Sequence, residues 1–514
     1  MDELNSNSRT KNTLLNVATG IGGKLVIMIF AFTVRTVFIR QLGAEYNGLN
    51  ALISNILSFL CLADIGLQNV LNFSLYSCIE KKDTDKILKN LKIFKRIYTY
   101  FALVIAVCGL AVIPLLHIIV KSSIPFNDIY TYYLLYLINS IATYLWIYKT
   151  TLLYADQNQH IINIGTLIFK ICTYGFQIIA ILLWKEIYLY LIIQIVFTFL
   201  QNLVLSYVTE RRYPFLVHLK LIERESIEIE QKKNIVATIK YRISDVLLNN
   251  TDNIIISAIL GTLFSGYYAN YYMLFQYIEG FIYTIGTGVI ASIGNLVQEK
   301  DVDTSYHNFK ALMLIYAVIA SACATCFYNC TQGFIPIWIG SEYVLSDSFL
   351  FLMILVFYLN ISMGAVKLYR EAMGLFIKVP RMMFVAAIIN ITLSILLGNA
   401  IGLIGIVIAT FVAKILTQYW FEPYLLFKEK LKKNVWIYHK NQIVNFCLTI
   451  ISIFFSSLIC SFLGSGFIWI ICRAIISVMI CIFIYYFVYS RSTEMNEILV
   501  RMKGFMNRRS IDAT

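Results

Sequence analysis

The sequence predicts an all-α polytopic membrane protein with about 14 transmembrane helices, arranged as two parallel six-helix lobes followed by two extra C-terminal helices. Three observations predict this fold: long apolar segments, an uneven distribution of basic residues between them, and an internal repeat. Hydrophobic residues make up 59% of the 514-residue chain and charged residues only 14%. Such a composition is typical of a chain that crosses a lipid bilayer many times.

The apolar segments are long enough to cross about 30 Å of hydrocarbon at about 1.5 Å per residue. Each is expected to be a helix, because backbone polar groups inside lipid must be hydrogen-bonded within the segment itself. In chain order, the predicted spans are 12–39, 48–77, 97–120, 129–153, 161–183, 187–208, 234–260, 266–297, 309–338, 345–369, 379–398, 402–427, 441–463 and 467–490.

The basic residues between the spans predict the orientation of the chain. Most of the 42 lysines and arginines lie in connections on one side, whereas the seven connections on the other side carry only Arg40, Lys121 and Lys185. This bias predicts that both termini are cytoplasmic. The net charge of +13 is therefore expected to face anionic lipid head groups, and we expect no nucleic-acid partner.

An internal repeat relates the first six spans to the next six. Residues 42–48 (Leu-Gly-Ala-Glu-Tyr-Asn-Gly) close the first span, and residues 260–266 (Leu-Gly-Thr-Leu-Phe-Ser-Gly) close the seventh at an offset of 218. Six spans return the chain to its starting side, so both copies have the same orientation. Parallel repeats of this kind are related by an axis along the membrane normal, with a substrate path between them. The repeat therefore predicts a two-lobed transporter.

These observations divide the chain into six parts. They are the N-lobe 1–208 (spans 1–6), a basic cytoplasmic linker 209–233, the C-lobe 234–427 (spans 7–12), a basic cytoplasmic loop 428–440, spans 13 and 14 at 441–490, and a basic cytoplasmic tail 491–514.

Three segments resemble one family of membrane proteins. Residues 35–49 (Arg-x-x-Phe-Ile-Arg-Gln-Leu-Gly-Ala-Glu-Tyr-Asn-Gly-Leu) resemble the end of the first helix of polysaccharide repeat-unit flippases. Residues 63–67 (Ala-Asp-Ile-Gly-Leu) and 334–340 (Phe-Ile-Pro-Ile-Trp-Ile-Gly) are similar to further elements of that family. The family, which includes O-antigen and capsule flippases, belongs to the superfamily of multidrug, oligosaccharidyl-lipid and polysaccharide exporters. The resemblance covers at least residues 10–430.

The resemblance implies a function and its partners. It implies that an undecaprenyl-diphosphate-linked oligosaccharide is moved from the inner to the outer leaflet of a bacterial cytoplasmic membrane by alternating access. Membrane lipids, and the polymerase and glycosyltransferases of the same pathway, are the other partners that it implies. In the related lipid II flippases the two extra helices line a groove for the lipid tail. Spans 13 and 14 match that role by position only.

Basic residues inside the spans are the candidate substrate contacts. A charge in a span is costly and normally faces a wet cavity or a partner, and a diphosphate needs guanidinium or ammonium donors. The alternative for residues near a span end is that they reach the interface. We expect the cavity cations to be Lys24, Arg35, Lys170, Arg242 and Lys414. Lys149 and Lys367 occupy matched repeat positions near cytoplasmic span ends, where they could act in gating or capture the head group. Arg473 in span 14 could contact the lipid diphosphate or reach the interface.

Acidic residues inside the spans are fewer. Asp64, Asp245, Asp252 and Glu279 could pair with the cavity cations or couple transport to H⁺ or Na⁺. For Asp245 the simpler interpretation is an ion pair with Arg242, one turn away. We expect no metal and no other cofactor.

Other membrane functions fit the same residues less well or cannot be separated by charge. A multidrug cation antiporter would share the fold but should have an acidic cavity, whereas basic residues outnumber acidic ones in these spans. A lipid II flippase carries the same diphosphate, so charge does not separate it from an O-antigen or capsule flippase. A polymerase, ligase or glycosyltransferase needs a large catalytic loop, and the outer connections here are short. The chain contains no Walker sequence, so we expect no ATP hydrolysis. As a transporter, the protein is expected not to be an enzyme.

Overall fold

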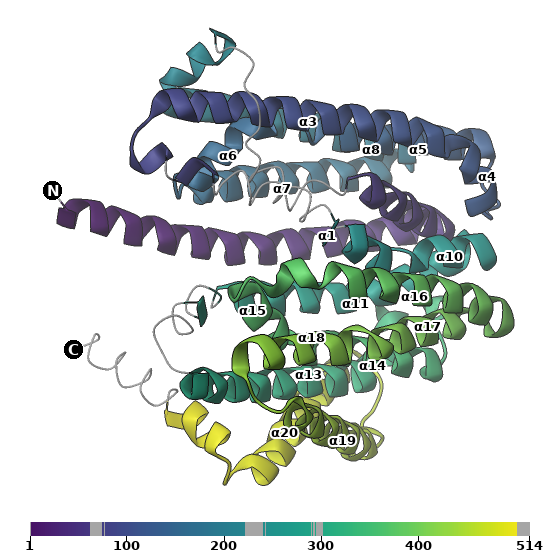
Figure 1. Ribbon diagram of the computed structural model, residues 1–514. Coiled ribbons are helices and arrows are strands. Elements are labelled where there is room, and N and C mark those ends of the chain that lie inside the picture. Colours follow the sequence, from purple (N-terminus) through teal and green to yellow (C-terminus); the bar gives the residue numbers. More distant parts are fainter. Residues whose placement is uncertain are drawn as a thin grey trace. The chain divides into compact units, whose positions relative to one another are not determined.

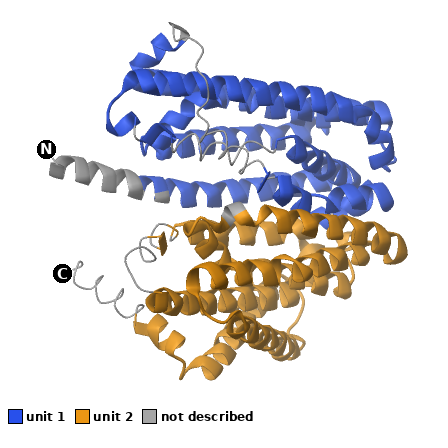
Figure 2. Ribbon diagram, in the orientation of Figure 1, with its two compact units in different colours: residues 1–269 blue, residues 270–514 orange. Residues whose placement is uncertain are grey.

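The computed structural model divides the chain into two compact units, residues Met1–Ala269 and Asn270–Thr514 (Figure 2). Every regular element of the described residues is a helix (Figure 1), which confirms the predicted fold class. The residues that the structure describes are 2–61, 74–76, 78–221, 240–241, 243–288, 290, 293–294 and 302–500.

The first unit is built mostly from long helices that pack along one another. Its α-helices are α1 (Asp2–Leu60), α3 (Thr84–Val112), α4 (Leu116–Ile119), α5 (Phe126–Ala142), α6 (Ile147–Ala155), α7 (Gln159–Trp184), α8 (Ile187–Arg212) and α10 (Asp252–Ile259). The 3₁₀ turns η1 (Ile113–Leu115) and η2 (Pro214–Leu221) also belong to it. The boundary between the units falls within α11 (Thr262–Thr287). The predicted lobe boundary lies earlier, in the linker 209–233, of which 222–233 lie outside the described residues.

The second unit contains the remaining helices. They are α13 (Val302–Trp338), α14 (Asp347–Ser362), α15 (Gly364–Ala372), α16 (Pro380–Ile401), α17 (Leu403–Leu416), α18 (Gln418–Leu426), α19 (Val435–Cys460) and α20 (Phe467–Tyr489), with short helical turns η3 (Ser341–Tyr343), η4 (Leu375–Lys378) and η5 (Phe427–Leu431). Within the described residues of both units, ten helices are long and apolar enough to cross a membrane. One of these, Ala18–Leu60, covers most of the first predicted span and part of the second.

The positions of the helix breaks agree with the predicted repeat. Gly43 interrupts α1 with φ +88°, and Gly261, at the offset of 218, precedes α11 with φ +103°. Both angles lie in the region that favours glycine. The fourth span of each copy is broken as well, into α5 and α6 in the first copy and into α14 and α15 in the second.

Hydrogen bonds between polar side chains join the two C-terminal spans to α13. The Ser321 hydroxyl of α13 contacts the hydroxyls of Thr449 in α19 and Tyr485 in α20. Two turns further along, Asn329 Nδ2 donates to Ser456 Oγ (2.8 Å) and Ser477 Oγ (2.9 Å). Hydrogen bonds of this kind hold helices together in lipid, where the hydrophobic effect does not. Helices α19 and α20 therefore form one packed group with α13.

Two backbone segments related by the repeat cross closely in the first unit. A Cβ atom on Gly48 would lie 1.8 Å from the carbonyl oxygen of Thr262, and one on Gly266 would lie 2.1 Å from that of Ala44. Asn47 Nδ2 donates to the Gly266 carbonyl (3.2 Å) beside this crossing. The Glu45 carboxylate, in the same segment, accepts from Ser122 Oγ (2.7 Å) and from the Ser123 amide (2.6 Å). The crossing therefore requires glycine at both repeat positions.

We expect Gly48→Ala to destabilise the protein, because the new methyl group would meet backbone atoms that cannot rotate away. Overpacking of this kind costs about 1–3 kcal/mol of unfolding free energy. Thermal unfolding of the purified protein measures the loss. Gly175→Ala, inside α7 with nothing within 4 Å of its Cβ position, is the matched control and should not lower stability. Equal melting temperatures for the two variants would contradict the close crossing.

Candidate functional site

The structure separates the predicted site residues into those of the first unit, those of the second, and two that it does not describe. Asp64 and Arg242 lie outside the described residues. Their predicted roles in ion coupling and in substrate binding therefore stay predictions, as does the Arg242–Asp245 ion pair.

Three predicted cavity cations lie on α1 and α7 of the first unit, which pack along each other. Lys24 is exposed and Arg35 is half-buried, both on α1. Lys170, on α7, is half-buried, and its Nζ lies 6.0 Å from the centre of the Tyr174 ring on the next turn. A cation over a tyrosine face is stabilised by the ring quadrupole. A substrate contact therefore stays a prediction for Lys24, Arg35 and Lys170.

Lys149, the predicted gating residue of the first unit, is buried in an ion pair. Its Nζ donates to Glu210 Oε1 (2.5 Å) and to Ser206 Oγ (2.8 Å), both on α8. The pair joins α6 to the cytoplasmic end that is predicted for α8. A substrate head group at Lys149 would therefore have to compete with Glu210.

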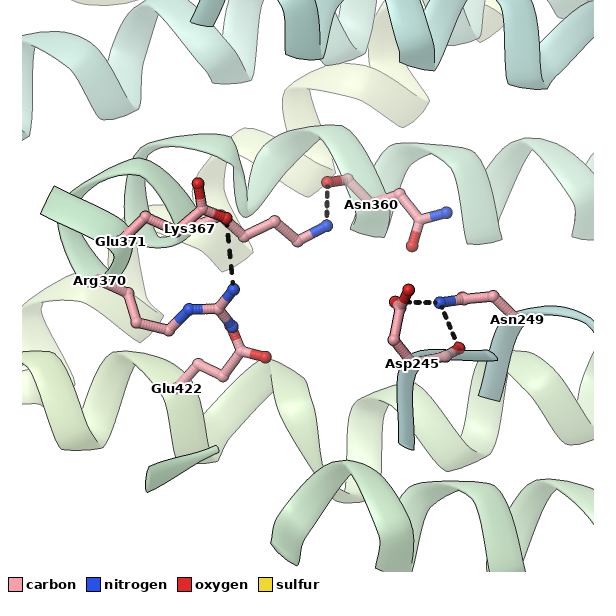
Figure 3. A network of polar contacts seen from close by, with 7 residues as sticks. All are labelled: Asp245, Asn249, Asn360, Lys367, Arg370, Glu371 and Glu422. Atoms are coloured by element: carbon pink, nitrogen blue, oxygen red, sulfur yellow. Dashed lines mark hydrogen bonds and ion pairs between the residues drawn. The ribbon is translucent and has the colours of Figure 1, made fainter. Parts of the chain in front are cut away.

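Two predicted acids of the first unit contact neutral side chains. Asp245 Oδ1 accepts from Asn249 Nδ2 (2.9 Å), one turn along the chain (Figure 3). The buried Asp252 accepts from the Tyr268 hydroxyl (3.2 Å). Both carboxylates accept hydrogen bonds from these side chains, and both residues stay candidates for ion coupling.

The remaining three candidates meet in the second unit around Asn360. The Asn360 side chain donates from Nδ2 to Glu279 Oε1 (3.0 Å) and accepts at Oδ1 from Lys414 Nζ (3.0 Å). Its backbone carbonyl accepts from Lys367 Nζ (3.1 Å; Figure 3). Helices α11, α14, α15 and α17 each supply one of the four residues. We call Glu279, Asn360, Lys367 and Lys414 the Asn360 cluster.

The break between α14 and α15 positions Lys367 for this contact. Met363, between the two helices, has φ −78° and ψ 0°, outside helical geometry. A lysine side chain on α15 can therefore extend back over the break to a carbonyl seven residues earlier. The same break occurs at the matched position of the first copy, which carries Lys149.

The Asn360 cluster can bind an anion. With both lysines and the glutamate ionised, its formal charge is positive. An ammonium group has three donors, and the Asn360 carbonyl is the acceptor found for Lys367 among the described residues. The other donors of the Lys367 ammonium group could bind the oxygens of a phosphate group. The cluster thus places the ammonium group of Lys367, which has donors available to a ligand, in the same group of residues as the carboxylate of Glu279.

Packing of the repeat does not require this cluster. At the offset of 218, the first copy has Cys61 where the second has Glu279, and Ala142 where the second has Asn360. Lys149 keeps the position of Lys367 but pairs with Glu210 instead. The first copy therefore forms its helices without these residues, and the polar set is specific to the second copy.

A second polar group, one turn beyond Lys367, was not predicted from the sequence. Arg370 and Glu422 are both buried, and Arg370 Nη1 lies 2.6 Å from Glu422 Oε2. Glu371 Oε1 lies 3.7 Å from Arg370 Nη2, so that Arg370 lies between two carboxylates (Figure 3). The one available signal was Glu422 itself, an acid within a predicted span, because such a residue normally has a partner.

The fold is shared with known transporters. No protein-family model matches the chain, and no curated protein matches it. The chain is similar to the structure of the lipid II flippase MurJ in an inward closed conformation, with a TM-score of 0.69 and 13% identity over 93% of this chain and 99% of that chain. It is also similar to an inward-facing multidrug resistance MATE family transporter of the MOP superfamily (TM-score 0.57, 13% identity, 79% and 96% of the two chains). The MATE transporter VcmN of Vibrio cholerae gives a TM-score of 0.55 and 14% identity over 84% and 99%.

Proposed function

We propose that this protein is a flippase that moves undecaprenyl-diphosphate-linked oligosaccharide repeat units from the inner to the outer leaflet for surface polysaccharide assembly. It works in a bacterial cytoplasmic membrane with both termini in the cytoplasm. Transport proceeds by alternating access, and the diphosphate is bound by cations inside the protein. Lys24, Arg35, Lys170, Arg242 and Lys414 bind it, and Lys149 and Lys367 capture the head group or act in gating.

The observation that carries the proposal is the convergence of Lys367 and Lys414 on Asn360. Two ammonium groups beside one carboxylate suit an anionic substrate better than a cationic drug. The fold adds support, since MurJ, whose name is lipid II flippase, matches nearly the whole chain. The resemblance of residues 35–49 to repeat-unit flippases favours an oligosaccharide repeat unit.

Lipid II itself is the second candidate substrate, and the similarity to MurJ is the observation that favours it. Its diphosphate would make the same contacts with the Asn360 cluster. The two substrates differ in their sugars, so a competition experiment with both lipids separates them.

Glu279 is the residue of the Asn360 cluster that could couple transport to an ion. Its carboxylate lies beside Asn360 and close to the two lysines, where a proton or Na⁺ would change the charge that the substrate meets. Asp64, Asp245 and Asp252 are the further candidates. Glu279→Gln should then weaken the dependence of transport on the ion gradient while leaving binding of the diphosphate intact.

Reconstitution tests the proposed function. The purified chain is placed in proteoliposomes with a fluorescent undecaprenyl-diphosphate oligosaccharide, and a glycosidase added outside reports how much of the lipid has reached the outer leaflet. Transfer that requires the protein and is inhibited by unlabelled lipid-linked repeat units supports the proposal. Cation antiport without lipid transfer would instead assign the protein to drug export.

A further inference from the structure

Arg473 is a basic residue on α20, the last predicted span. It lies six residues from the first residue of that helix, Phe467, which corresponds to about 9 Å at 1.5 Å per residue. The turn before α20 contains Gly464 and Gly466, and the predicted topology places this turn on the outer side of the membrane. Arg473 is half-buried between the turn and α13.

The guanidinium group is fixed by backbone carbonyls. Nη2 donates to the carbonyls of Leu463 (3.2 Å) and Gly464 (3.3 Å) in the turn. Nη1 lies 3.7 Å from the Cβ position of Gly333 on α13, at the same distance as Ile470 Cγ1, so the guanidinium packs against the backbone of α13. The turn carbonyls therefore hold the planar group in one orientation, next to Gly333 of α13.

Several donors of this guanidinium remain for a ligand. A guanidinium has five N–H donors, and the two carbonyls account for those of Nη2. The Nε donor is buried and donates to no atom of the described chain. No carboxylate of the described residues pairs with Arg473, in contrast to Arg370 in the same unit. A buried donor and a free guanidinium edge are complementary to the oxygens of a phosphate group.

Exposed apolar side chains surround the same turn. Phe462 is 85% exposed and Ile468 73% exposed, and Phe467 and Trp469 are exposed as well. Aromatic and aliphatic side chains at the end of a membrane helix lie at the level of the lipid head groups and upper acyl chains. A ligand that approaches Arg473 past these side chains would therefore be a lipid rather than a soluble anion.

We propose that Arg473, held by the Leu463–Gly464 turn beside Gly333 of α13, binds the phosphate group of an anionic lipid in the predicted outer leaflet. Two lipids carry that chemistry: the undecaprenyl diphosphate of the exported unit, and an anionic phospholipid such as phosphatidylglycerol. The first source rests on the proposed function and makes the site the place where the transported lipid is held after it crosses the membrane. Since α20 is bound to α13 by hydroxyl contacts, the site belongs to one packed group of helices.

Photolabelling of the full chain in nanodiscs tests the site. One probe is a photoreactive polyprenyl diphosphate, the other a photoreactive phosphatidylglycerol, and peptide mapping measures labelling of residues 461–473. We expect the diphosphate probe to label this segment in the wild-type protein. Arg473→Gln should reduce the labelling about tenfold, the effect of losing charge-assisted hydrogen bonds. Arg473→Lys, which keeps the charge but loses the planar donors, should give an intermediate loss.

Arg491→Gln is the matched control, because Arg491 is an exposed arginine just beyond the other end of α20. It should leave labelling of 461–473 unchanged. Labelling by phosphatidylglycerol alone would keep the phosphate site but overturn the exported lipid as its source. Labelling by either probe that is insensitive to both Arg473 variants would overturn the site itself. The assay needs no transport, so its failure is distinguishable from failure of the proposed function.

Discussion

If the protein is the proposed repeat-unit flippase, reversal of one charge in the Asn360 cluster should largely block surface polysaccharide assembly. In Lys367→Glu the ammonium that donates to the Asn360 carbonyl is replaced by a carboxylate, which repels both Glu279 and a diphosphate. Loss of one charge-assisted contact costs about 1.5–3 kcal/mol, and reversal adds repulsion, so we expect transport to fall at least about 100-fold. Complementation of a gene deletion, with quantified surface polymer, measures the effect. Lys414→Gln should show a smaller loss, about tenfold.

Lys378→Gln is the control for these variants. Lys378 belongs to the same unit, but it is exposed and pairs with the partly exposed Glu429 at 2.6 Å. Exposed ion pairs contribute little, and this variant should transport at the wild-type rate. If the Lys367→Glu protein is present in the membrane and its cells make as much surface polymer as the wild type, the Asn360 cluster does not lie on the substrate path.

The Arg370–Glu422 pair should give the largest loss of stability. Both side chains are buried, so that Arg370→Met leaves Glu422 without its closest cation. Removing one partner of a buried ion pair costs about 3–5 kcal/mol of unfolding free energy, whereas replacing both by apolar residues is often neutral. We therefore expect Arg370→Met and Glu422→Leu each to unfold at a much lower temperature than the wild-type protein. The double variant should recover most of the loss, as measured by thermal unfolding of the purified chain.

The double-mutant cycle contains its own control, because the coupling free energy is the part of the loss that the double variant recovers. Glu371, 3.7 Å from Arg370 and less buried than Glu422, offers a second comparison. Replacement of Glu371 by glutamine should lower the unfolding free energy far less than Glu422→Leu does. Additive losses in the double variant would mean that the two residues act independently.

Much of the fold could be predicted from the sequence, because the membrane restricts the chain to helices and the repeat appears in it twice. The repeat predicted that 42–48 and 260–266 are equivalent, and the structure gives both Gly43 and Gly261 a positive φ. Helix ends were harder to place. The span predicted as 345–369 ends in the structure with α15 at Ala372, so that Arg370 lies in a helix rather than in the following loop. Apolar content marks where hydrocarbon contact ends, not where a helix ends.

The candidate site could be predicted only in part. Lys367, Lys414 and Glu279 stand out in the sequence because a charge in an apolar segment needs a partner. Asn360, which joins them, is a neutral residue in α14 and carries no such signal. Its role depends on the packing of four helices from distant parts of the sequence. Nor did the sequence predict that Lys149, which matches Lys367 in the repeat, pairs with Glu210 on α8.

The most direct test of the account is a gene deletion followed by extraction of undecaprenyl-linked material and a surface-polymer assay. If the protein is a repeat-unit flippase, the deletion strain accumulates the complete lipid-linked repeat unit on the inner side of the membrane and loses surface polymer. The wild-type gene restores both, and Lys367→Glu does not. Normal polymer and normal lipid intermediates, together with increased sensitivity to cationic drugs, would contradict the account and assign the protein to drug export.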